Sequence, residues 1–378
     1  MRTSLRWAVL VAATAAGVMF VSSGLAGAAS IGSSLPVVRA AAGGALGNYQ
    51  ITGVEDAVGC VTAHRCMAVG YGGGTAAGQV VTVVGGKQVR VSVVPSASNL
   101  VAVSCPNRFG CWAIGSPRIG HRNFVLVKIS PVGGVRSVTR VRVQGGASLN
   151  EISCTSMTSC ELFGITLTNS YHNNWYFFAW TGQKLSRPYF VKPPEVSYLA
   201  PGGISCWRET CVAVGASTGG GSASPTVDGI ITTSNGVPST ARTGGGTGFS
   251  DVSCVSSSTC YATTLGSFTA TPGNTVVTLD NGVAGNVQSL PTYWGSSIAC
   301  AGATCWAAGV TPPSPRPAVF MMITSGVPAG SPVIDTATGG LGFPGSGSHP
   351  AIARRGNGFA ALGPAASGGP DVSEVVTN

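Results

Sequence analysis

The chain has 378 residues, of which 9% are charged and 44% are hydrophobic, and it contains 56 glycines. This composition excludes a protein of solvated, charged helices and favours one of strands and turns with a surface of small and hydroxyl residues. The formal net charge is +9. We expect this positive charge to be spread thinly along the chain, without the run of Lys and Arg residues that a nucleic-acid-binding surface needs. The charge therefore supports at most non-specific attraction to an anionic cell wall or lipid headgroup.

Residues 1–30 have the pattern of a secretory signal peptide. Arg2 and Arg6 give a basic start, residues 7–21 are apolar, and small residues at 26–29 offer a cleavage site. Removal of this leader lowers the net charge to +7 (9 − 2). We therefore expect a secreted or envelope-associated protein without a span in its mature part. The alternative is an uncleaved anchor, because a bilayer span takes about 20 residues.

A twelve- or thirteen-residue unit recurs six times after the leader. In each copy an apolar and a small residue precede a cysteine, a short polar connection leads to a second cysteine, and a small-apolar run follows that usually ends in glycine. The first cysteines lie at 60, 105, 154, 206, 254 and 300, so the steps are 45 to 52 residues. This period is typical of one four-stranded propeller blade.

Each period also carries the strands of such a blade. The residues before the first cysteine and after the second predict two antiparallel strands. A third strand, a turn dipeptide and a fourth strand follow, as in 80–84, Gly85-Gly86 and 89–94. The dipeptides Gly133-Gly134, Asn235-Gly236, Asn281-Gly282 and Ser325-Gly326 take the same place, and such pairs supply the positive φ of a tight hairpin.

A copy without cysteines, residues 351–363, places Arg354 and Phe359 where the cysteines would stand. A third strand follows at 371–378, and we expect residues 34–41 to add the outer strand of this last blade and close the ring. Closure removes the open sheet edges. The sequence thus predicts an all-β, seven-bladed β-propeller over residues 31–378, with four-stranded antiparallel blades starting near 54, 99, 148, 200, 249, 295 and 349.

The cysteines predict six disulfides, because an exported chain with an even count of paired cysteines favours bridges across hairpins. The pairs are Cys60 with Cys66, Cys105 with Cys111, Cys154 with Cys160, Cys206 with Cys211, Cys254 with Cys260, and Cys300 with Cys305. Zinc binding is the alternative, but the four histidines show no matched placement. We expect no metal and no cofactor.

The third period contains an aromatic run, Trp175 to Trp180. A propeller strand lies between neighbouring blades, so packing explains continuous apolarity there. Ligand stacking is the less favoured alternative. Tyr171 and His172 precede the run, and we expect both to lie in a loop.

The period, the exported context and the Cys-x4/5-Cys-x-Ala-x-Gly unit resemble the secreted bacterial propellers of the sialidase-like, Asp-box superfamily. The resemblance covers 31–378 as architecture and implies a sialidase-like fold. The turns at 233–238 and 279–284 keep the glycine of an Asp box and lose its other residues. No local motif places the sialidase arginines, Tyr–Glu pair or acid here, so the activity is not carried over.

Glycosidase chemistry needs two carboxylates facing one sugar. Glu55, Glu151 and Asp251 each precede a first-strand cysteine, near the expected axis, and we expect them to be single exposed carboxylates. The variable loops opposite the disulfides are where we expect a binding site. Its candidate residues are Arg118, His121, Arg122, Tyr171, His172, Tyr198 and Arg316.

We expect an exported, monomeric, non-enzymatic propeller that binds a protein, a glycan or a wall component and not nucleic acid. A glycan-cleaving enzyme of sialidase-like shape and a purely structural envelope protein are the alternatives. Two carboxylates at one point of the axis would favour the enzyme.

Overall fold

The computed structural model describes residues 47–52, 54–72, 77–118, 123–143, 147–168, 172–191, 198–218, 226–234, 236–239, 242–244, 248–264, 274–290, 294–310, 318–334, 351–355, 358–364 and 372–377. All of them belong to one compact unit, Val38–Asn378, separate from residues 1–37. Every named element within these ranges is a β-strand. None of the described segments is a helix of the length and apolarity that crossing a membrane requires.

Six sheets each take consecutive strands in chain order, paired antiparallel, and we number them blades 1 to 6. Blade 1 holds β2 (Val54–Thr62), β3 (Arg65–Gly72), β4 (Ala77–Val84) and β5 (Lys87–Val94), and blade 2 holds β6 (Ala97–Asn107), β7 (Gly110–Pro117), β8 (Asn123–Ile129) and β9 (Val135–Arg142). Blade 3 holds β10 (Ala147–Ser156), β11 (Ser159–Thr168), β12 (His172–Trp180) and β13 (Tyr189–Val191).

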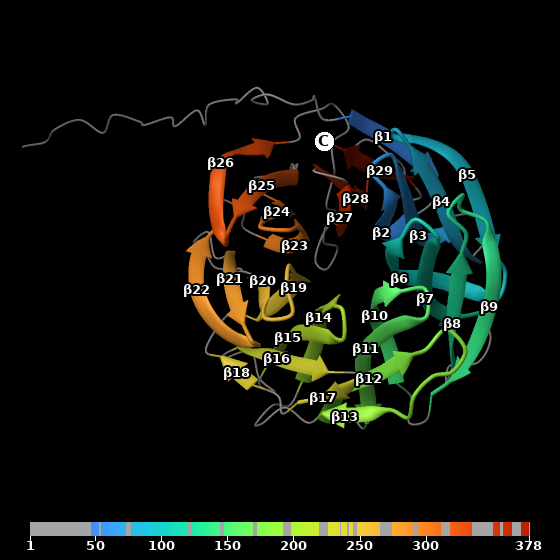
Figure 1. Ribbon diagram of the computed structural model, residues 1–378. Helices are drawn as coiled ribbons and strands as arrows, with labels where there is room; N and C mark the ends of the chain where they lie inside the picture. The colour runs from blue at the N-terminus through green and yellow to red at the C-terminus, as the bar shows by residue number, and fades with distance from the viewer. Residues whose placement is uncertain are drawn as a thin grey trace, which may run out of the picture. The chain divides into compact units, whose positions relative to one another are not determined.

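Blade 4 holds β14 (Tyr198–Trp207), β15 (Thr210–Thr218), β16 (Thr226–Ser234) and a split outer strand, β17 (Val237–Pro238) and β18 (Arg242–Gly244). Blade 5 holds β19 (Phe249–Cys254), β20 (Thr259–Thr264), β21 (Thr275–Asp280) and β22 (Val283–Ser289). Blade 6 holds β23 (Trp294–Ala301), β24 (Thr304–Val310), β25 (Ala318–Thr324) and β26 (Val327–Ile334). The blades stand side by side around a common centre (Figure 1). This architecture is a β-propeller of four-stranded antiparallel blades.

A further sheet joins β27 (Ala351–Arg355), β28 (Gly358–Pro364) and β29 (Val372–Thr377) to β1 (Gly47–Thr52), and we call it the closing sheet. The strand that pairs with β29 is β1 and not the expected stretch 34–41, which lies outside the described residues. Pro36 within that stretch lacks the N–H that a ladder needs. Asn48 to Thr52 alternates polar and apolar residues, as a paired strand does.

Each predicted disulfide is present, and each joins the first two strands of its blade near their hairpin. The prediction of six bridges in a repeated unit is therefore confirmed. The turn dipeptides are confirmed in the same way at Gly85-Gly86, Asn281-Gly282 and Ser325-Gly326, where both residues have positive φ. These hairpins and the disulfides lie at the same end of the blades, because the third strand runs parallel to the first.

The hydrophobic core consists of separate clusters, each between two neighbouring sheets. The cluster between blades 3 and 4 contains Phe163, Trp175 and Phe177 from one and Ala213 and Ile231 from the other. The closing sheet packs in the same manner, with Ala360 against blade 1 and Phe359 against blade 6. Neighbouring sheets therefore depend on each other for burial of their apolar faces.

The aromatic run belongs to this core. Trp175, Tyr176 and Phe177 are fully buried, and Phe178 and Trp180 nearly so, which confirms packing. Gly229 on β16 of the next blade makes the room, since a Cβ there would collide with the Trp175 ring. The sheet sandwich explains why this strand is apolar on both faces.

The glycine that ends the repeated unit has a steric cause. A bulge in the first strand lies opposite it, between Leu149 and Glu151 in blade 3. A Cβ added at Gly164 would collide with the Ser148 carbonyl oxygen, and one at Gly115 with that of Asn99. A residue with a side chain therefore does not fit opposite the bulge without a shift of the backbone.

Candidate functional site

The first strands of the blades carry positions that are equivalent in their ladders, and two of these positions hold carboxylates. In the ladders between the first and second strands, Glu151 pairs with Phe163 and Asp251 pairs with Thr263, and each lies just after the bulge. The same register in blades 1, 2, 4 and 6 holds Ala57, Ala102, Gly203 and Ser297. Glu151 in blade 3 and Asp251 in blade 5 thus lie at one level on either side of Gly203.

Asp251 uses both of its carboxylate oxygens. Oδ1 accepts a hydrogen bond from the backbone N–H of Val252 (2.7 Å), and Oδ2 accepts one from the backbone N–H of Ile298 in blade 6 (2.9 Å). A side chain at position 203 would collide with Oδ1, so the bare backbone of Gly203 makes the room for this carboxylate. Asp251 therefore connects the inner strands of blades 5 and 6.

The carboxyl groups of Glu151 and Asp251 both have raised pKa values. Burial raises the pKa of Asp251 to about 7, although its two backbone hydrogen bonds oppose the rise. Burial also raises the pKa of Glu151 well above its usual range, and the nearby charge of Asp251 adds to the effect. The expectation of single exposed carboxylates is wrong for these two residues, which are half-buried and interact with each other. The side chain of Glu55 lies outside the described residues.

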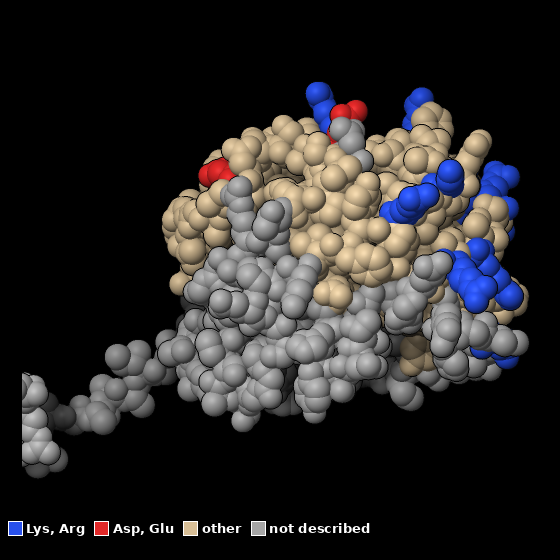
Figure 2. Space-filling view, turned by 90° about the horizontal axis from the view of Figure 1, so that it is seen from below, with Lys and Arg blue, Asp and Glu red and all other residues tan. Residues whose placement is uncertain are grey.

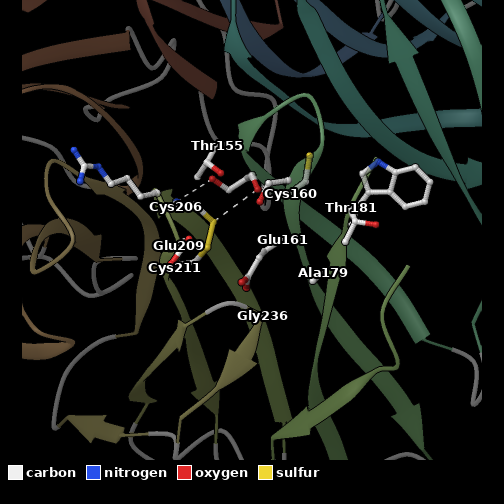
Figure 3. A pocket seen from close by; sticks show the side chains of 13 residues that line it. Thr155, Cys160, Glu161, Ala179, Thr181, Cys206, Glu209, Cys211 and Gly236 are labelled. Carbon is white, nitrogen blue, oxygen red and sulfur yellow. Dashed lines mark hydrogen bonds between the residues drawn. A yellow bond between two sulfur atoms is a disulfide. The ribbon is translucent and has the colours of Figure 1, made fainter. Parts of the chain in front are cut away.

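A third carboxylate lies in a hollow of about 180 Å³ between blades 3 and 4, at the disulfide end (Figure 3). Glu161 on β11 is buried, and its Oε2 accepts a hydrogen bond from the Thr233 hydroxyl of blade 4 (2.7 Å). The backbone N–H of Gly236 also donates to this carboxylate, while burial raises its pKa. The remaining lining is mostly hydroxyl and disulfide groups, including Ser153, Thr155, Ser159, Thr181 and the bridge Cys206–Cys211.

The structure places three of the seven candidate site residues. Arg118 is exposed and directly follows β7, with its backbone N–H donating to the Ser96 carbonyl (3.0 Å). His172 and Tyr198 begin β12 and β14, so the expectation that His172 lies in a loop is wrong, because the hairpin ladder extends to the pair Thr168–His172. All three lie at the end opposite the disulfides. His121, Arg122, Tyr171 and Arg316 lie outside the described residues.

Within the described ranges, no group of three His, Cys, Asp or Glu residues is arranged to hold a metal ion. Sequence reasoning noted Glu151 and Asp251 but paired neither with a partner. The signal was present in the spacing, since both stand three residues before a first-strand cysteine. Glu161 had no such signal, because its partners Thr233 and Gly236 lie more than seventy residues along the chain.

No protein-family model matches the sequence, and no curated protein matches it significantly. The structure is similar to the WD40 domain of Neurospora crassa Pan2, with a TM-score of 0.54 and 12% identity over 88% of this chain and 95% of that one. It is also similar to YCF48 bound to a D1 peptide, with a TM-score of 0.52 and 12% identity over 89% and 96%.

A subtype N10 neuraminidase-like protein from a bat virus isolate has a TM-score of 0.44 and 10% identity over 73% of this chain and 93% of that one. At identities this low, the similarity to the first two structures establishes the propeller fold and nothing finer.

Proposed function

We propose that this chain is an exported, non-enzymatic propeller that binds a protein, a glycan or a cell-wall component, with the closing sheet as its seventh blade. Six disulfides fit an oxidising, extracytoplasmic environment. Removal of residues 1–30 and a monomeric state are part of this proposal.

One observation carries the proposal: the carboxylates with known partners serve the scaffold. Asp251 accepts a backbone hydrogen bond from blade 6, and Glu161 accepts a hydroxyl and a backbone N–H from blade 4. A general acid or base must be within hydrogen-bond reach of a substrate proton. Carboxylates that already connect neighbouring blades are poorly placed for that role, whereas a rigid ring suits presentation of a binding surface.

The experiment is a binding screen of residues 31–378 against glycans and purified wall fragments, with hydrolysis followed in the same samples. The control variant replaces Arg118, His121 and Arg122 by alanine. Saturable binding without release of sugar supports the proposal, and loss of binding in the variant places the site at the loop end. Absence of binding to every glycan and wall fragment, with the protein folded, overturns glycan and wall binding as its function.

A glycan-cleaving enzyme is the second candidate, and the pair Glu151 and Asp251 is the observation that favours it. Glu151 has a raised pKa, as a general acid requires, and Asp251 lies at the same level of the ring. The test is release of reducing ends from wall polysaccharide by the wild type and by Glu151→Gln. If the wild type releases reducing ends and Glu151→Gln does not, the protein is a glycan-cleaving enzyme and the binding proposal is wrong.

A further inference from the structure

The net charge of the chain comes from two neighbouring blades. Residues 57–150, which span most of blade 1 and all of blade 2, contain ten Lys and Arg residues and no Asp or Glu. The other residues contain eleven Lys and Arg (21 − 10) and twelve Asp and Glu, a net charge of −1. The expectation of a thinly spread charge is therefore wrong. Figure 2 shows the same asymmetry: most of the blue side chains lie on the right of the view without red ones among them, and one further blue side chain lies beside a red one at the top.

The outer strand of blade 2 presents a row of cations. Val138, Arg140 and Arg142 alternate along the regular part of β9, so their side chains share one face of the strand, and Arg136 lies at the irregularity between Val135 and Ser137. All four side chains are exposed. Alternate residues of a strand are about 6.7 Å apart. Arg140 and Arg142 are therefore one such step apart, and Arg136 lies near the start of the same strand.

The outer strand of blade 1 continues this surface. Lys87 and Arg90 are exposed on β5, together with Val89, Val91 and Val93. The turn between β8 and β9 lies against this strand, since a Cβ at Gly134 would be 3.4 Å from Nη2 of Arg90. Blades 1 and 2 therefore share one surface of arginines and valines.

We propose that β5 and β9 form a docking surface for a linear polymer that carries carboxylate or phosphate groups at regular intervals. This inference rests on the proposed binding function and names its ligand class. Arg140 and Arg142, one strand step apart, together with Arg136 match a chain of repeated anions, because Arg binds carboxylate and phosphate bidentately. The valines between them provide apolar contact for the polymer backbone.

The composition of the two strands selects this polymer over single-stranded nucleic acid. Proteins that bind single strands stack bases on aromatic side chains. β5 and β9 contain no Phe, Tyr or Trp. Nucleic-acid binding is kept as an outcome of the test.

The test measures binding of residues 31–378 to polygalacturonate, to inorganic polyphosphate, to single-stranded DNA and to neutral dextran over a range of salt. The variant is Arg136→Thr with Arg140→Thr and Arg142→Thr, since Thr keeps the strand propensity. The control removes the same charge from other exposed positions, with Lys184→Thr, Arg187→Thr and Arg208→Asn. Asn suits position 208, where φ is 55°.

We expect the wild type to bind one or both anionic polymers and not dextran, and the two polymers distinguish carboxylate from phosphate as the ligand group. The β9 variant should bind at least about tenfold more weakly at ~0.1 M salt. The slope of its log binding constant against log salt concentration should be smaller in magnitude by about two to three. The control variant should change affinity less than about threefold, because distant charges are screened beyond ~10 Å.

Three outcomes would overturn the inference. The first is an equal loss of affinity in the two variants, and the second is no binding of either polymer by the folded wild type. The third is tighter binding of DNA than of both polymers. Binding of wall fragments that the β9 variant retains would overturn this surface and leave the proposed function in place. Absence of wall and glycan binding in the wild type would instead reject wall and glycan binding as the proposed function. Circular dichroism and the thermal midpoint verify that both variants are folded.

Discussion

The hydroxyl of Ser205 accepts a hydrogen bond from the backbone N–H of Cys254, the equivalent cysteine of the next blade, at 2.9 Å. The same bond recurs from Cys154 to Ser104, from Cys206 to Ser153 and from Cys300 to Ser253, at 2.9 to 3.0 Å. The serine before the first cysteine of blades 2 to 5 therefore connects its blade to the next one, while that cysteine connects two strands within the blade.

Replacement of Ser205 by Ala should lower the free energy of unfolding by about 1–2 kcal/mol, because the part-buried Cys254 N–H loses its acceptor. The measurement is equilibrium unfolding in guanidinium chloride. Ser137→Ala is the control, since Ser137 is exposed on the outer strand β9. The control should stay within about 0.5 kcal/mol of the wild type. If the two substitutions lower the free energy of unfolding equally, Ser205 does not stabilise the contact between blades 4 and 5.

Gly164→Ala should destabilise the protein by about 1–3 kcal/mol, because the added methyl group collides with the Ser148 carbonyl and forces a backbone shift. Gly285→Ala on β22 is the matched substitution, and its nearest neighbour would be the Thr278 carbonyl at an ordinary 3.4 Å. We expect this control to be neutral or slightly stabilising, since it also reduces the entropy of the unfolded chain. Thermal unfolding of both variants measures the difference. A neutral Gly164→Ala would show that the bulge adapts to a side chain.

The blades could be predicted from the sequence because each unit carries its own local signals. The first strands of blades 1 and 5 begin at Val54 and Phe249, and the others begin close to the expected positions. Cysteine spacing and positive-φ turn residues report on contacts a few residues apart, so one copy of the repeat predicts the others.

Contacts between blades could not be predicted in the same way. The partners Glu161 and Thr233, or Asp251 and Ile298, are about one or two periods apart, and the local sequence around one residue does not identify the other. The charge on β5 and β9 was missed for a related reason. Its cations are separated along the chain, and the absence of acidic residues between positions 56 and 151 becomes meaningful only when the two outer strands share a surface.

Replacement of Cys206 and Cys211 by Ser should cost about 2 kcal/mol, the loop-entropy value for a bridge that closes so short a loop. The bridge spans five positions of sequence, so the unfolded chain gains little freedom without it. Unfolding in guanidinium chloride with and without a reductant measures this cost. Reductant should destabilise the wild type further than the variant, because five bridges remain in the variant and six in the wild type. A variant that fails to fold would instead show that the bridge is needed for strand pairing.

Asp251 should make the protein less stable as the pH rises from about 4 to 7. Burial raises the pKa of its carboxyl group from the ordinary range of an aspartate to about 7, so the folded state binds more protons than the unfolded chain across this range. Stability falls wherever the folded state holds the extra proton, by at most about 1.4 kcal/mol per pH unit for one group. Asp251→Asn, which resembles the protonated acid, should therefore show a smaller fall in its free energy of unfolding between pH 4 and 7. Asp280→Asn, at an exposed position, should keep the wild-type slope. Equal slopes for wild type and Asp251→Asn would mean that Asp251 remains ionised in the fold and that its two backbone hydrogen bonds outweigh its burial.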